Sequence, residues 1–99
     1  MILTESEEEK LLEAIAIENI EKVKSILNNS TENKKILKLN EKNKNGNYPL
    51  YSAISNNNIE IVQLLIGYAN QHQIILKLNE KINMDYIHYY GVLLIIILK

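Results

Sequence analysis

The sequence predicts an all-α fold, a short stack of paired antiparallel helices joined by turns and loop arms. Three observations support this prediction: a sequence repeat 39 residues long, apolar residues spaced three and four apart inside each repeat, and no segment typical of a central sheet. A chain of 99 residues suits one small domain with a modest core.

The repeat is the strongest signal. Residues 36–42 (Ile-Leu-Lys-Leu-Asn-Glu-Lys) recur unchanged as residues 75–81, an offset of 39 (75 minus 36), and 14 of the 32 positions in residues 11–42 match residues 50–81. We therefore divide the chain into an N-terminal, capping-like repeat unit (1–42), a second unit (43–81) and an atypical hydrophobic tail (82–99).

Two helices are expected in the first unit. Ser6 and Glu9 have the spacing of a capping box, so a helix should begin there and continue to about Ile17. A break at Glu18 is followed by Asn19, a suitable cap for a second helix. The expected buried stripes are Leu11, Leu12, Ala14 and Ile15 in the first helix, and Ile20, Val23, Ile26 and Leu27 in the second.

The second unit repeats this plan after a turn. Asn-Gly within residues 43–47 favours a tight turn with positive φ at Gly46. Pro49 suits the first position of a helix, where its missing N–H costs nothing. Residues 56–58 should form the next turn, and 59–69 a helix whose inward residues are Ile61, Val62, Leu64, Leu65 and Tyr68.

These residues resemble the ankyrin repeat. Residues 46–53 (Gly-Asn-Tyr-Pro-Leu-Tyr-Ser-Ala) match its turn glycine and T-P-L-H-x-A helix start, and residues 60–65 read E-I-V-x-L-L. Tyr48 and Tyr51 replace the family's threonine and histidine, so the usual polar staple cannot form. The period is also longer than the family's period of about 33, and we expect the extra residues to form loops at 29–34 and 70–73. The Ile-Leu-Lys-Leu that follows is either a strand-like arm or an extra helical turn.

The resemblance implies a non-catalytic, protein–protein interaction module with a protein partner. Carried over position by position, the contact residues are Lys44, Asn45, Asn47, Ser55 and Asn56, while Gly46 and Pro49 shape the turn. Two interpretations of Tyr48 and Tyr51 remain open, namely partner contact and core packing in place of the threonine and histidine.

The composition argues against other functions. The chain has no cysteine, its two histidines (His72 and His88) are isolated, and no Ser-His-acid arrangement has a suitable strand-turn-helix setting, so we expect no enzyme, metal, cofactor or small-molecule substrate. All eleven cations are lysine, the net charge is -1 and residues 59–69 hold no cation, which disfavours nucleic-acid binding. The longest apolar run (92–98) is too short to span a membrane and the amino terminus is acidic, so we expect a cytoplasmic protein.

The tail suggests an alternative function class. A third unit should open near Ile82, with its proline at position 88 (49 plus 39), but no such motif follows. In the neighbouring reading frame, the codons for residues 84–91 permit Gly-Leu, then Pro-Leu-Leu-Trp. The tail therefore looks like an ankyrin repeat translated out of frame, and the chain like a truncated or frameshifted remnant with no selected activity of its own. The apolar run at 92–98 would then be either a makeshift cap or an unattached, aggregation-prone segment.

Overall fold

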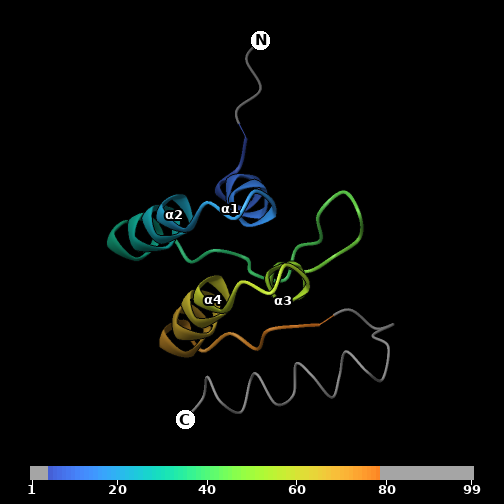
Figure 1. The fold of residues 1–99 in the computed structure, drawn as a ribbon. Helices are drawn as coiled ribbons and strands as arrows, with labels where there is room; N and C mark the ends of the chain where they lie inside the picture. Colours follow the sequence, from blue (N-terminus) through green and yellow to red (C-terminus); the bar gives the residue numbers. More distant parts are fainter. Residues whose placement is uncertain (1–4, 79–99) are drawn as a thin grey trace.

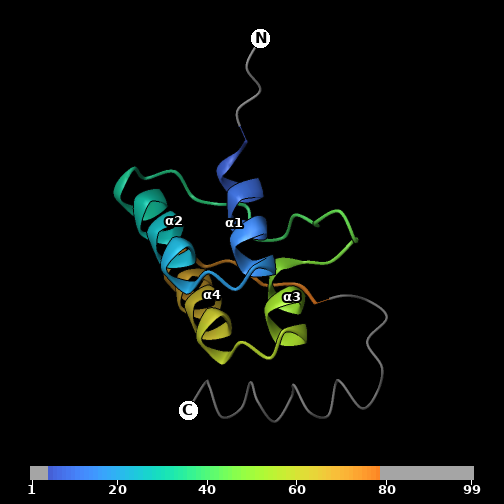
Figure 2. The same ribbon diagram turned by 45° about the horizontal axis from the view of Figure 1, so that its top comes forward.

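The computed structural model describes residues 5–78, and these form two layers of two helices each (Figure 1). The first layer holds α1 (Glu7–Ala16) and α2 (Ile20–Glu32), and the second holds α3 (Pro49–Ser55) and α4 (Ile59–His72). Helix α1 packs on α3 and α2 packs on α4, so the two pairs stack in the same orientation (Figure 2). Within this part of the chain every regular element is a helix, and the all-α prediction is confirmed.

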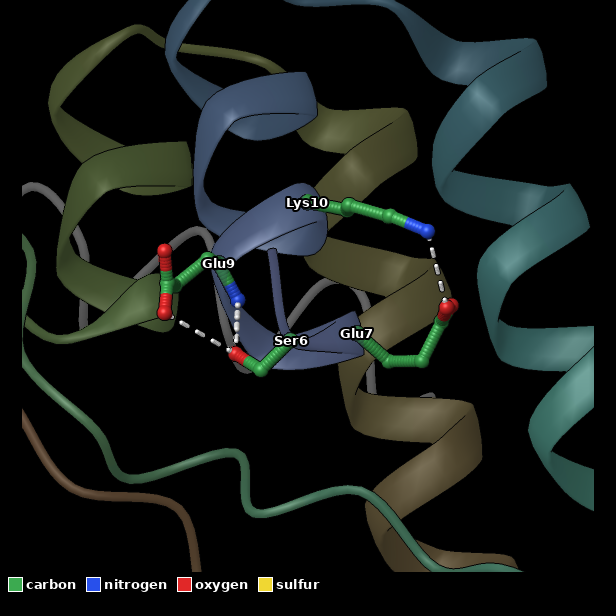
Figure 3. A network of polar contacts seen from close by, with 4 residues as sticks. All are labelled: Ser6, Glu7, Glu9 and Lys10. Carbon is green, nitrogen blue, oxygen red and sulfur yellow. Dashed lines mark hydrogen bonds and ion pairs between the residues drawn. The ribbon is translucent and has the colours of Figure 1, made fainter. Parts of the chain in front are cut away.

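Helix α1 begins with the predicted serine cap. The Ser6 hydroxyl oxygen accepts from the Glu9 N–H at 3.1 Å, and its proton points to the Glu9 carboxylate at 3.4 Å (Figure 3). One turn further along, Lys10 Nζ lies 3.2 Å from Glu7 Oε1. Three glutamates in the first turn face the positive end of the helix dipole, which favours helix formation at this end.

The two helix pairs turn in the same way. Glu18 and Asn57, 39 residues apart, both have positive φ (57° and 56°) and end the first helix of their pair. The next residue in each case is an asparagine cap: Asn19 Oδ1 accepts from the Lys22 N–H, and Asn58 Oδ1 accepts from the Ile61 N–H, both at 3.1 Å. Because both turns carry the same amide cap, α2 and α4 begin at equivalent positions of the repeat, Ile20 and Ile59.

The prediction of loops at 29–34 and 70–73 is wrong, because α2 continues to Glu32 and α4 to His72. The longer period is therefore absorbed mainly as extra helix. Serine and threonine near a helix end usually compete with the backbone, but here their hydroxyls have partners: Ser30 Oγ donates to the Lys35 carbonyl at 2.8 Å, and Thr31 Oγ1 to the Leu27 carbonyl at 3.2 Å. Lys34 and Gln73, with φ of 56° and 58°, end this extension in each unit.

An extended arm follows each pair, so the alternative of an extra helical turn does not apply. Residues 35–38 form no helix, and the arm runs between the two helix layers (Figure 1). Its alternation of side chains buries Leu37 and Leu39 and exposes Ile36. Residues 74–78 run along the opposite side of α3 and α4, in the place that the first arm has relative to α1 and α2.

The core is continuous across both layers. It contains equivalent residues from each unit, such as Leu11 and Ile15 in α1 and Leu50 and Ile54 in α3, all at most 5% exposed. Such repeat units gain stability mainly by burying their apolar faces against a neighbour. Within residues 5–78, no helix is long and apolar enough to cross a bilayer.

Candidate functional site

A hairpin loop at residues 43–47 projects from the body beside α3 (Figures 1 and 2). Asn43 organises it from within, because its Oδ1 accepts from the N–H groups of Asn45 (2.9 Å) and Asn47 (3.0 Å). The Asn43 carbonyl accepts from the Gly46 N–H at 3.0 Å, and the Asn43 N–H donates to the Asn47 carbonyl at 2.8 Å. Gly46 has φ of +79°, which only glycine adopts without strain. The loop is therefore held by its own hydrogen bonds.

Three of the predicted contact residues lie on this loop. Lys44 and Asn45 are exposed at its tip, and Asn47 is half-buried at its base. The Asn45 side chain makes no hydrogen bond to any described residue, and Lys44 forms no ion pair there. Both side chains are thus available to a partner, while the Asn43 bonds fix the backbone that carries them.

The base of the loop leads into α3. Pro49 is the first residue of this helix, and Tyr48 precedes it with an extended backbone and no side-chain cap bond. The Lys42 ammonium lies 5.2 Å from the centre of the Tyr48 ring, within the range of a cation–π contact. The Asn43 amide also reaches Ser52 Oγ at 3.4 Å, so the hairpin is tied to the helix that it precedes.

The other two predicted contact residues lie at the far end of α3. Ser55 is its last residue and Asn56 its C-cap, both exposed. Asn56 Nδ2 donates to the Ile15 carbonyl at 3.4 Å, so part of its role is to join the two helix pairs. A helix of seven residues spans about 10 Å, and the five predicted residues therefore form two groups rather than one cluster.

A face shared by α3 and α1 lies between these groups. Ser52 and Ser55 are three residues apart and share a face of α3. Their counterparts 39 residues earlier, Glu13 and Ala16, share the equivalent exposed face of α1. We call the hairpin (43–47), Ser52, Ser55, Asn56, Glu13 and Ala16 the inner surface. The sequence interpretation missed the two α1 residues, although the 39-residue offset was the signal that could have located them.

Charge is distributed unevenly around the inner surface. Lys44 in the hairpin and the adjoining Lys42 are basic, whereas α1 contributes exposed carboxylates at Glu9 and Glu13. Among the described residues, no ion pair joins the two groups. The surface can therefore offer a positive and a negative region to the same ligand.

A groove on the opposite side lies between α2 and α4. It is lined by the half-buried Leu64, by Tyr68 and by Gly67, with polar side chains such as Lys24 and Gln71 at its rim. A second hollow lies between the start of α1 and the end of α2 and includes Glu8 and Lys35. Neither contains a set of ligands for a metal ion, since the described residues hold no group of three histidine, cysteine, aspartate or glutamate side chains.

A comparison with protein-family models matches the model for ankyrin repeats (many copies) over residues 11–66, more than half of the chain. The chain belongs to the ankyrin repeat family. No curated protein and no solved structure matches it.

The ankyrin repeat is typically non-catalytic and generally mediates protein–protein interaction. The present chain departs from the family motif at two positions, where Tyr48 and Tyr51 replace the motif's threonine and histidine. Tyr48 supplies no side-chain cap, and both tyrosines are half-buried. In this ankyrin repeat the hairpin bonds of Asn43 and the proline at the first helical position hold the start of α3 instead.

Proposed function

We propose that this ankyrin repeat chain is a protein-binding module that contacts its partner through the inner surface. The observation that carries the proposal is the internally braced hairpin, in which Asn43 fixes the backbone while Lys44 and Asn45 are exposed at the tip. A preorganised loop loses little conformational entropy on binding. Loops held by a helical scaffold are also where binding residues concentrate.

The charges define what the partner should offer. An acidic group would suit Lys44 of the hairpin and the adjoining Lys42, and a basic group would suit the α1 face at Glu9 and Glu13. Such complementarity gives specificity and association rate more than affinity. The area is that of two short repeat units, below the usual size of a stable interface, which favours a transient complex. We place this binding in the cytoplasm, as the composition favours.

A charge-exchange experiment tests the proposal. One variant, Lys44→Glu with Glu13→Lys, exchanges charges on the inner surface, and its control, Lys22→Glu with Glu32→Lys, does the same at exposed positions of α2. Proteins retained by the immobilised full chain from an extract of its source organism would be quantified by mass spectrometry. We expect the inner variant to lose retention of a partner by about tenfold or more, corresponding to about 1.4 kcal/mol, and the control to keep it. Partners that depend on the α2 pair and not on the inner pair would contradict the proposal.

The tail supports a second candidate, a frameshifted remnant of a longer ankyrin-repeat protein without selected activity. Residues 82–99 lie outside the described residues, so this proposal rests on the codon argument, in which the neighbouring frame can place a proline across positions 87 and 88. The coding DNA tests it directly. The proposal requires Gly-Leu and Pro-Leu-Leu-Trp in that frame, followed by further E-I-V-x-L-L-like repeats, and scattered stop codons there would refute it.

A further inference from the structure

The tip of the hairpin carries a pair of residues suited to a covalent reaction with each other. Asn45 is the one asparagine of the sequence that a glycine follows. Glycine has no Cβ to hinder the approach of its nitrogen to the preceding side chain, and a Cβ added to Gly46 would meet nothing within 4 Å. Asn45 is exposed, and its side chain has no hydrogen-bond partner among residues 5–78. The Asn45 carboxamide is therefore free to turn toward the Gly46 nitrogen.

Asn43, in the same loop, is in the opposite situation. Its Oδ1 accepts from the main-chain N–H groups of Asn45 and Asn47, and its Nδ2 donates to Ser52 Oγ at 3.4 Å. The Asn43 carboxamide is thus held at both its oxygen and its nitrogen, and a lysine follows it in the sequence. One carboxamide of the hairpin braces the loop, and the other is unconstrained.

We propose that Asn45 is a site of covalent self-modification, in which its carboxamide is converted through a succinimide to aspartate or isoaspartate. The Gly46 nitrogen attacks Asn45 Cγ and forms a new N–Cγ bond, and the carboxamide nitrogen takes up the Gly46 proton and leaves as ammonia. Water then opens the five-membered ring. Cleavage of the N–Cγ bond gives aspartate, and cleavage of the original peptide bond gives isoaspartate. The net reaction consumes one water, releases one ammonia and needs no other reactant.

The hydrogen bonds of the hairpin control this reaction. The Gly46 N–H donates to the Asn43 carbonyl at 3.0 Å and closes a β-turn with Lys44 and Asn45 at its centre. The Gly46 nitrogen must leave this bond to lose its proton and reach Asn45 Cγ. Local opening of the turn is enough, and it costs less than unfolding the helices. The Asn43 carboxamide opposes the opening through its two bonds to the loop backbone, so Asn43 is a positioning residue that sets the rate at Asn45.

The two products change the loop in different ways. Aspartate keeps the length of the backbone and places a carboxylate next to Lys44, which takes the net charge of the chain from -1 to -2 (-1 minus 1). Isoaspartate makes the same change in charge, and it also adds one backbone atom between residues 45 and 46. Asn43 Oδ1 accepts from N–H groups on both sides of this linkage, at 2.9 and 3.0 Å. The longer backbone therefore cannot keep both bonds in their present geometry.

The hairpin belongs to the inner surface, so the conversion would regulate that surface. Either product offsets the positive charge that Lys44 offers to an acidic group, and isoaspartate also releases the braced backbone. This effect on binding rests on the proposed function, whereas the reaction at Asn45 does not. Because ammonia is lost, the change runs in one direction, from a braced, basic loop to one without net charge.

Time courses on the full-length chain in neutral buffer test the proposal. Peptide mapping with electron-transfer fragmentation measures aspartate and isoaspartate at each asparagine. We expect the folded chain to convert faster at Asn45 than at any other asparagine. Asn43→Ala should raise the rate at Asn45 by about tenfold or more, because it removes two hydrogen bonds that hold the loop. The matched control, Asn33→Ala, removes an exposed asparagine at the C-cap of α2 and should leave that rate unchanged.

Hydrogen exchange separates the two products. The Asn47 N–H, which donates to Asn43 Oδ1, should lose protection in the isoaspartate form. It should keep protection in Asn45→Asp, which carries the same charge on an unaltered backbone. Neither measurement uses a partner, so a failure of the binding proposal would leave these results unchanged.

Three results would overturn the proposal. If Asn45 converts only in the urea-unfolded chain, the folded hairpin does not support the reaction. If Asn43→Ala and Asn33→Ala give the same rate at Asn45, the Asn43 bonds do not control it. If another asparagine of the folded chain converts first, the exposed Asn-Gly pair is not the favoured site.

Discussion

Leu39 and Leu78 occupy the same position of an identical seven-residue segment, yet Leu39 is 1% exposed and Leu78 is 36% exposed. The sequence of the segment is therefore not what determines its burial. The difference arises because the first arm lies between two helix layers, whereas the second arm has a layer on one side within the described residues (Figure 1). In a stack of repeats, position relative to a neighbour determines how much a given leucine contributes to stability.

Truncation of each leucine to alanine tests whether the two positions contribute differently to stability. Leu39→Ala leaves a cavity in the core and should lower the free energy of unfolding by about 2–5 kcal/mol. Leu78→Ala removes a partly solvated side chain and should cost less than about 1 kcal/mol. Urea denaturation of the two full-length variants measures both values. Similar losses would show that the second arm is as well covered as the first.

Two glycines of the second unit should respond with opposite sign. Gly46→Val places a β-branched residue at φ of +79° and should destabilise the chain by about 1–3 kcal/mol. Gly67 lies inside α4, where the equivalent residue of α2 is Asn28, and a Cβ added there would meet nothing within 4 Å. Gly67→Ala should therefore stabilise by about 0.5–1 kcal/mol. Melting temperatures that move in the same direction would contradict one of these two assignments.

The tyrosine between the units should matter through its hydroxyl. Tyr68→Phe keeps the ring, which lies 4.3 Å from that of His72, but removes the acceptor for Leu37 and the donor for Ser30. We expect a loss of about 1–3 kcal/mol, because a buried N–H is left unsatisfied. The half-buried Tyr51 is a control, and Tyr51→Phe should change the stability by less than about 0.5 kcal/mol. Equal effects at the two positions would show that the hydrogen bonds of the Tyr68 hydroxyl with Leu37 and Ser30 do not stabilise the fold.

The smallest effect concerns the contact between the two arms. The Asn40 amide donates to the Ile75 carbonyl at 2.8 Å and accepts from the Lys77 N–H, so one side chain pairs with the backbone of the second arm. Asn40→Ala should cost about 0.5–1.5 kcal/mol and increase hydrogen exchange at Lys77. Asn33→Ala, at an exposed C-cap, is the comparison. No change in exchange at Lys77 would mean that the pairing does not persist in solution.

The sequence was informative where local chemistry decides the structure. Ser6, Asn19 and Pro49 act at helix starts through bonds or constraints a few residues long, and all three patterns could be interpreted without a structure. The helical extension to Glu32 could not, because Ser30 is accommodated there by Tyr68, a residue 38 positions away. Likewise the grouping of Glu13 with the hairpin depends on the packing of α1 against α3, which no local pattern encodes.

Hydrogen exchange at the two identical arms tests the central claim most directly. The account predicts that the Leu37 N–H, which donates to the Tyr68 hydroxyl at 2.9 Å, is protected to nearly the level of the helix core. The Leu76 N–H, at the same position of the same seven-residue sequence, should exchange at close to the rate of an unstructured chain. Equal protection of the two groups in the monomeric full-length chain would contradict the claim that an arm is protected where a following helix pair covers it.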